Sequence, residues 1–307
     1  MEHVILDVDT GIDDALAIAY AFRSSELNVL GITTGFGNVS EKEATRNTLQ
    51  VLDVLGLEHE IPVIAGADKP LSGVHIKGKS THIHGEDGLG NCGLPLSKRR
   101  PLSTEAANFI ISKVKELPHQ VTLIAVGPQT NLATAIKKDP EIVNLVKRVV
   151  VMGGAVTVPG NVTPNAEANI YADPEAASVV FESGIPVTLV GLDVTMQTLL
   201  RNEVVNEWSS VKSAYSDFLQ TICNSYIGAY HQFDSSLGGC ALHDPLAVGV
   251  VIDPSFVKTV PMCVGVDLGK GDTFGKTYEV QQGKANIEVC LDIDVDRFVS
   301  HFLQRVI

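Results

Sequence analysis

The segment VILDVDTGIDD, residues 4–14, joins a short apolar run to the first turn of a helical pattern. Four of these residues are aspartates, at positions 7, 9, 13 and 14. Carboxylates this close repel one another, so one or more must protonate unless a cation or hydrogen-bond donors keep them ionised. Helix capping and the helix dipole, at about 1 kcal/mol each, explain one or two of the four. They do not explain Asp9 and Asp14 together, which suggests a bound cation.

The same strand-then-helix rhythm continues along almost the whole chain. Short apolar runs rich in β-branched residues predict strands at 3–6, 29–33, 63–65, 121–125, 149–152 and 187–190. Amphipathic stretches predict helices at 14–22, 41–55, 104–117, 131–137 and 174–182. This alternation is typical of βαβ units. We therefore expect an α/β fold, with an open, mainly parallel sheet flanked by helices, in one domain that covers residues 1–307.

Composition and charge limit the classes of partner. The chain has 307 residues, of which 45% are hydrophobic and 19% are charged, as in an ordinary globular protein. Its formal net charge of -13 argues against a nucleic acid or an anionic membrane surface as the main partner, because both require basic footprints. The one basic run, at 98–100, precedes Pro101 and is interpreted as a solvated surface loop.

Cysteine usage and the N-terminus favour a reducing compartment. The five cysteines are widely spaced and include no C-x-x-C pair, so they predict neither a disulfide framework nor a zinc ribbon. No apolar stretch reaches the length of a membrane span, and the N-terminus lacks the layout of a signal peptide. We therefore expect a cytoplasmic protein with no membrane partner.

Polar segments follow the predicted strands, at the sheet edge where such folds bind ligands. They are DVDTGIDD, GFGN, VGPQTN and GGA, and HDP at 243–245 opens a later helical pattern. Ligands that are all oxygen suit Ca2+ or Mg2+, and two local aspartates do not complete a Ca2+ sphere. The other ligands are expected from Asp244, a backbone carbonyl near Val126, and waters or substrate hydroxyls. An N-cap role is an equal alternative for Asp244, because Asp-Pro commonly begins a helix.

Five motifs in this order resemble those of the inosine–uridine-preferring nucleoside hydrolase family. They are DVDTGIDD at 7–14, FGN at 36–38, HGEDGLG at 84–90, MGGA with GNVTPNAEANIYADPEAA at 152–177, and HDP at 243–245. The resemblance spans most of the chain. It implies a Rossmann-like core and the Ca2+-dependent hydrolysis of ribonucleosides to ribose and free base. One departure is Thr10, where the family most often has proline, and it affects the turn more than the chemistry.

The resemblance also implies roles for the acidic residues. Asp9 is similar to the family's general base, which activates a water, and it is a metal ligand as well. Asp14 matches a bidentate Ca2+ ligand, and Asp244 matches the ligand from the far side. Val126 matches a ligand that binds through its carbonyl oxygen. Asp7 is expected to support the loop from behind.

The expected ribose contacts follow from the same resemblance. Asp13 and Asn38 match residues that hold the ribose 2′- and 3′-hydroxyls, so the site would prefer ribose to deoxyribose. The residues that match anchors of the 5′ side are Asn161, Glu167 and Asn169. Glu167 and Asn169 are two positions apart, so in an extended segment they face the same way. Met152, at a strand end, is expected under the sugar.

Histidines and aromatic residues are expected near the leaving base. His243 resembles the group that protonates a purine ring nitrogen, and the usual histidine pKa suits that task. His84 matches a position close to the base. His82 and His84 form an H-x-H pair, but no third ligand at fitting spacing supports zinc. Tyr230 and His231 precede HDP in a helical pattern and are candidates for contact with the base, whose identity stays open.

Two other functions fit parts of the pattern. The string DVDT also resembles the start of a haloacid-dehalogenase-type Mg2+ phosphatase. That family needs a downstream acidic motif, for which Gly271-Asp272 is the only candidate, and it gives Asp13 and Asp14 no role. A non-catalytic, Ca2+-dependent nucleoside-binding protein would need neither Asp9 as a base nor His243 as an acid.

The resemblance to the nucleoside hydrolase family further implies that the protein forms a homodimer or homotetramer.

Overall fold

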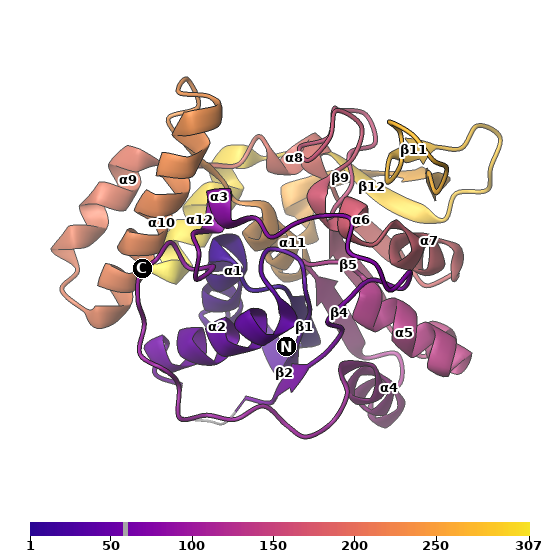
Figure 1. Cartoon of the computed structure of the whole chain (residues 1–307), viewed down its shortest axis with the longest axis horizontal. Coiled ribbons are helices and arrows are strands. Elements are labelled where there is room, and N and C mark those ends of the chain that lie inside the picture. Colours follow the sequence, from indigo (N-terminus) through magenta and orange to yellow (C-terminus); the bar gives the residue numbers. More distant parts are fainter. Residues whose placement is uncertain (58–60) are drawn as a thin grey trace.

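The computed structural model describes residues 1–57 and 61–307, and an eight-stranded sheet runs through its centre (Figure 1). The strand order is β3-β2-β1-β4-β5-β6-β12-β9. Its pairings are parallel except for the antiparallel pairing of β12 with β9. The strands are β1 (Glu2–Val8), β2 (Leu27–Thr34), β3 (Val63–Ala65), β4 (Val121–Ala125), β5 (Arg148–Met152), β6 (Val187–Val190), β9 (Val257–Met262) and β12 (Ile287–Ile293). This architecture confirms the predicted α/β fold.

Helices cover both faces of the sheet, and each face contributes to one apolar layer of the core (Figure 1). Alternate side chains of β1 enter different layers, since Val4 and Leu6 pack in one and Ile5 in the other. The longer helices are α1 (Ile12–Phe22), α2 (Glu41–Val54), α4 (Ala106–Glu116), α5 (Thr130–Lys138), α7 (Pro174–Glu182), α10 (Ala214–Phe233), α11 (His243–Ile252) and α12 (Val295–Val306). Within the described ranges, no helix has the length and apolar character needed to span a membrane.

Shorter elements lie at the sheet edges and between the main helices. The short helices are α3 (Thr81–His84), α6 (Ala168–Ala172), α8 (Leu192–Thr195) and α9 (Asn202–Glu207), with 3-10 turns at Pro140–Asn144, Trp208–Ser210 and Pro254–Phe256. Two small antiparallel sheets pair β7 (Leu199–Arg201) with β8 (Gly239–Ala241), and β10 (Val264–Val266) with β11 (Thr277–Glu279). The basic run at 98–100 lies in an irregular surface segment, where Arg99 Nε donates to Asp53 Oδ1 at 2.8 Å.

The predicted strands and helices are all present, with ends shifted by no more than two residues. The prediction lacks β9 and β12, which complete the sheet. β9 is an edge strand that carries Lys258 and Pro261, and four of its residues are exposed. Edge strands commonly carry lysine and proline instead of a continuous apolar run, so their sequence signal is weak.

Candidate active site

The turn after β1 is held together by a carboxylate. Asp14 accepts hydrogen bonds from the backbone N–H groups of Asp9, at 3.1 Å, and Gly11, at 2.8 Å. A Cβ at Gly11 would lie 2.7 Å from His84 Nδ1, so only glycine fits there without displacing the histidine. The Thr10 hydroxyl bonds to Thr48 Oγ1 of α2 at 2.7 Å, and this contact anchors the turn at the position where proline was expected.

Four buried carboxylates meet at the carboxyl end of β1. They belong to Asp9, Asp13, Asp14 and Asp244, none more than 7% exposed. Asp13, Asp14 and Asp244 each present an oxygen within 4.8 Å of the other two. Asp244 is the second residue of α11, whose N-cap is Leu242, so the N-cap alternative for Asp244 is wrong.

These carboxylates lack the donors that would satisfy them. Within the described ranges, Asp9 Oδ1, Asp13 Oδ1 and Asp244 Oδ2 are buried without a hydrogen-bond partner. Burial raises the pKa of Asp9 well above its ordinary value, and the neighbouring Asp14 carboxylate raises it further. Burial, with repulsion from Asp14, likewise raises the pKa of Asp13 to about 7. Unpartnered, all-oxygen groups of this kind fit a hard divalent cation, which would keep them ionised.

Asp9 is held firmly but keeps one oxygen free. The Asn38 backbone N–H donates to Asp9 Oδ2 at 2.6 Å, and Asn38 Nδ2 donates to Asp14 Oδ2 at 3.2 Å. A Cβ at Gly127 would lie 3.0 Å from the free oxygen, Asp9 Oδ1, and one at Gly37 would overlap Oδ2. The glycines of the FGN and VGP segments therefore make room for the Asp9 carboxylate.

Asp7 lies in β1, two residues before Asp9, and supports the four carboxylates from behind. Its Oδ1 accepts from Thr33 Oγ1 at 2.6 Å and from Asn131 Nδ2 at 2.8 Å. Asn131 also donates to the Thr34 carbonyl, at 3.0 Å. Asp7 thus ties β1 to β2 and α5, which agrees with the supporting position expected for it.

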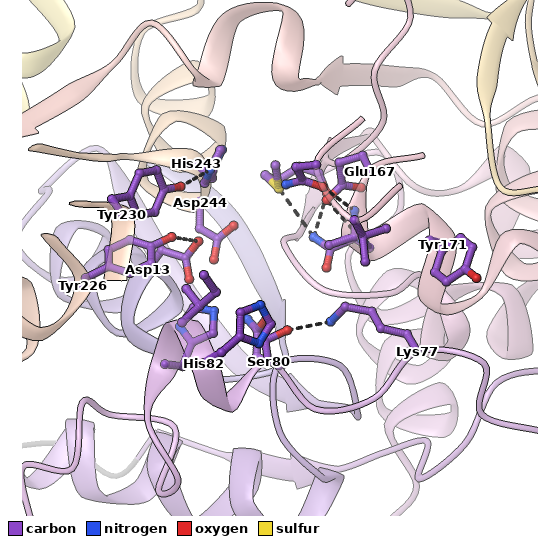
Figure 2. Close-up of a pocket in the computed structure, with 18 of the residues that line it drawn as sticks. Asp13, Lys77, Ser80, His82, Glu167, Tyr171, Tyr226, Tyr230, His243 and Asp244 are labelled. Carbon is purple, nitrogen blue, oxygen red and sulfur yellow. Dashed lines mark hydrogen bonds between the residues drawn. The ribbon is translucent and has the colours of Figure 1, made fainter. Parts of the chain in front are cut away.

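A cavity of about 620 Å3 opens over the carboxylates (Figure 2). Asp13 and Asp244 line it, and Figure 2 shows Tyr226, Tyr230 and His243 beside them. The residues shown on the opposite side in Figure 2 are Glu167, Tyr171 and Lys77. This volume lies within the range of small-molecule sites.

The segment from Asn161 to Asn169 forms one wall of the cavity. Glu167 is the N-cap of α6 and accepts from the backbone N–H groups of Gly154, Asn169 and Ile170, at 3.0, 2.9 and 3.1 Å. Asn169 is therefore helical, and the assumed extended segment is wrong, because the Glu167 carboxylate satisfies the first turn of a helix. Both side chains nevertheless line the cavity, as Asn161 does.

Asn169 links this wall to two strand ends. Its Nδ2 donates to the Val126 carbonyl at 2.7 Å, and to the Met152 carbonyl at 3.3 Å. Met152 Sδ lies 3.4 Å from the same nitrogen. A carbonyl oxygen has two lone pairs, so Val126 retains one for a further partner.

His243 is bonded at both ring nitrogens. Its Nδ1 lies 2.7 Å from Thr195 Oγ1, and its Nε2 lies 2.7 Å from the Tyr230 hydroxyl. Burial lowers the pKa of His243 to about 4, so the ring is neutral near pH 7. The neighbouring hydroxyl of Tyr226 donates to Asp13 Oδ2 at 3.2 Å.

His84 is placed by the turn after β1. Its Nδ1 accepts the backbone N–H of Ile12 at 3.1 Å, so its hydrogen is on Nε2. The ring stacks on Tyr226, with centroids 5.5 Å apart, and burial lowers the pKa of His84 to about 3.

His231 is exposed on α10 and does not line the cavity, although its neighbour Tyr230 does, because successive helical residues point in different directions. In this structure His231 therefore lies outside the cavity where the base is expected.

Lys77, Tyr171, Tyr226 and Thr195 are site residues that sequence reasoning missed. Lys77 lies in the irregular segment between β3 and α3, outside the five motifs, and no local pattern marks it. Tyr226 shares a helical face with Tyr230, four residues later, and this spacing is the one signal that could have identified it. Asp272, the acidic partner required of a phosphatase, is exposed in a loop and does not line the cavity.

Comparisons with known proteins identify the family of this chain. Residues 4–300 match the model of the family described as inosine-uridine preferring nucleoside hydrolase. Uridine nucleosidase 1 of Arabidopsis thaliana is 42% identical, over 98% of this chain and 91% of that protein. The pyrimidine-specific ribonucleoside hydrolase RihA of Citrobacter koseri is 38% identical, over 99% and 97%.

A solved structure shares the fold over nearly its whole length. The purine-preferring ribonucleoside hydrolase from Gardnerella vaginalis superposes with a TM-score of 0.94 and 40% identity, over 99% of this chain and 98% of that one. The family match covers nearly all of the chain, including the carboxylates, the cavity wall and the helix that carries His243. This chain belongs to the inosine-uridine preferring nucleoside hydrolase family.

Proposed function

We propose that this protein hydrolyses the N-glycosidic bond of ribonucleosides, releasing ribose and the free base, with Ca2+ as its cofactor. The observation that carries the proposal is the group of buried, unpartnered oxygens of Asp9, Asp13 and Asp244 at one end of a nucleoside-sized cavity. Family membership supplies the reaction class.

The proposed Ca2+ ligands are Asp9, Asp14, Asp244 and the Val126 carbonyl oxygen. Ca2+ accepts six to eight oxygens in flexible geometry, whereas Mg2+ demands an octahedron, so two or more carboxylates with a carbonyl suit Ca2+ better. Bound there, Ca2+ would orient the sugar and lower the pKa of a water. Asp13 and Asn38 would hold the 2′- and 3′-hydroxyls, and Tyr226 keeps the Asp13 carboxylate oriented.

Asp9 is the proposed general base. Its Oδ1 is unpartnered within the described ranges and its Oδ2 is fixed by the Asn38 N–H, so one oxygen is free to accept a proton from water. The transition state of such reactions resembles an oxocarbenium ion, and carboxylates beneath the sugar stabilise its positive charge. The sugar would lie on Met152, between the carboxylates and the wall formed by Asn161, Glu167 and Asn169.

The leaving base is assisted by residues that lie beside Asp13 and Asp244 (Figure 2). His243 is neutral near pH 7 and shares a hydrogen bond with the Tyr230 hydroxyl, which positions its ring. We propose that His243 takes up a proton from solvent as the glycosidic bond breaks, passes it to the departing base and is left neutral again, while the attacking water gives its proton to Asp9. His84 presents a neutral Nε2–H and acts as a hydrogen-bond donor in the same region.

One assay tests both the reaction and the metal. Release of reducing sugar is measured with inosine, adenosine, uridine and cytidine, because the relatives' names include uridine, pyrimidines and purines. Ribose release that stops with EGTA and returns with Ca2+, but not with Mg2+, supports the proposal. Nucleoside binding without ribose release would favour a binding protein instead.

The remaining expectations concern the whole molecule. We infer one domain, because the central sheet contains strands from both ends of the chain. A cytoplasmic location and a homodimer or homotetramer stay predictions, the first from the cysteine pattern and the second from the resemblance. Cell fractionation and sedimentation velocity test them.

A further inference from the structure

Lys77 places an ammonium group inside the cavity. Its side chain lines the cavity, and Figure 2 shows it extending toward Ser80 from the side that carries Glu167 and Tyr171. Nζ donates to Ser80 Oγ at 2.9 Å and to the Gly37 carbonyl at 3.3 Å. An ammonium has three N–H groups, so one has no partner within the described residues.

Glu167 offers the complementary group on the same side of the cavity. Its carboxylate accepts three backbone N–H groups, and a carboxylate has about four acceptor positions, so one stays open. Burial lowers the pKa of Lys77, while the carboxylates of Asp9 and Glu167 act in the opposite direction and favour the charged form. A free donor and a free acceptor therefore lie on the same side of the cavity (Figure 2).

We propose that Lys77 is a further substrate-binding residue, which donates to the ribose 5′-hydroxyl, the group on the side of the sugar that the family resemblance already assigns to Glu167. A hydroxyl is both donor and acceptor, so it satisfies the two groups at once. A 5′-phosphate does not, because its dianion has no hydrogen to donate to Glu167 and would be repelled by that carboxylate. This inference rests on the proposed function and specifies substrates with an unmodified 5′-hydroxyl.

The test compares substrates with and without that hydroxyl. Values of kcat/KM are measured for uridine and 5′-deoxyuridine, and for inosine and 5′-deoxyinosine, in the wild type and in Lys77→Met. Removal of the 5′-hydroxyl should lower wild-type kcat/KM by about 10-fold or more, the usual effect of losing a hydrogen bond to a charged group. In Lys77→Met this discrimination should shrink about 10-fold, with the fall confined to the 5′-hydroxyl substrates.

Lys79→Met is the matched control. Lys79 carries the same charge two residues later and also lines the cavity, but its Nζ pairs with Glu43 of α2 at 2.6 Å, so the discrimination should equal that of the wild type. An equal fall on both substrates in Lys77→Met would show that Lys77 only supports its segment, and would overturn the inference. Better use of uridine 5′-monophosphate than of uridine by the wild type would overturn it in favour of phosphate recognition.

Failure of the proposed function is recognised separately. If the wild type releases no ribose from any nucleoside, binding affinities are measured instead of kcat/KM. Calorimetry then gives the Kd of uridine and of 5′-deoxyuridine for the wild type and for Lys77→Met. Weaker binding of 5′-deoxyuridine that disappears in Lys77→Met supports the inference even then. Equal affinities for the two ligands, or no binding of either, would overturn it.

Discussion

Two neighbouring parts of the site, here called the acidic end and the base end, are built in different ways. At the acidic end, the Asp14 carboxylate accepts hydrogen bonds from the backbone N–H groups of Asp9 and Gly11. The Asp9 carboxylate accepts one from the backbone N–H of Asn38. At the base end, the His243 ring of α11 is held by the side-chain hydroxyls of Tyr230 on α10 and Thr195 on α8. Backbone contacts fix geometry closely, whereas side-chain contacts can be exchanged without altering the fold. We infer that the acidic end performs chemistry common to all substrates and that the base end selects among them.

The strongest test of the acidic end is Asp9→Ala. Loss of a general base should lower kcat about 100- to 10,000-fold for purine and pyrimidine nucleosides alike. Initial rates of ribose release measure this effect, and a thermal melt checks that the variant folds. Near-normal turnover would contradict the proposed mechanism, and a loss limited to one class of base would contradict the division between the two ends.

Asp244→Asn tests the metal at the same end. Mutating a residue that only hydrogen-bonds to a metal ligand lowers the affinity for the metal about 10- to 100-fold. Loss of a charged ligand should therefore lower the Ca2+ affinity by at least about 100-fold. Calorimetric titration with Ca2+ measures this affinity. A saturating cation should also raise the unfolding free energy of the wild type, by about 2.7 kcal/mol at 100 times Kd. An unchanged Ca2+ affinity in the variant would remove Asp244 from the ligand set.

His243→Ala tests the selective end. We expect kcat to fall about 100-fold for inosine, whose base needs protonation to leave, and less for uridine. Parallel ribose assays give the ratio of the two effects. Equal losses would mean that His243 is not the acid for purines.

The smallest expected effect is that of Tyr230→Phe, which removes one hydrogen bond to His243. A bond of about 1 kcal/mol corresponds to a fall of about fivefold in kcat/KM. His231→Ala, one residue further along α10, is the control, because its exposed side chain lies outside the cavity. A larger effect at His231 than at Tyr230 would show that the helical face was assigned wrongly.

The same contrast explains which site residues could be predicted. Asp9, Asp13 and Asp14 are neighbours in one turn between a strand and a helix, where local patterns are most informative. Lys77 lines the cavity from an irregular segment, and Thr195 contacts His243 from a four-residue helix. Neither segment has a period that indicates the direction of its side chains. His231 was placed near the base because a helical pattern alone gives the spacing of a face, not the direction in which that face points.

The sequence by itself determined the order of the main strands and helices from β1 to β6, the family and the cluster of acids after the first strand. Hydrophobic periodicity and motif spacing are properties of the chain, so they can be read before it folds. Only the tertiary structure decided that Asp244 joins Asp13 and Asp14, that Glu167 begins a helix, and that Lys77 enters the cavity. These placements depend on how segments that are distant in the sequence pack against one another. No local sequence pattern specifies how far apart such segments lie or in which direction their side chains point.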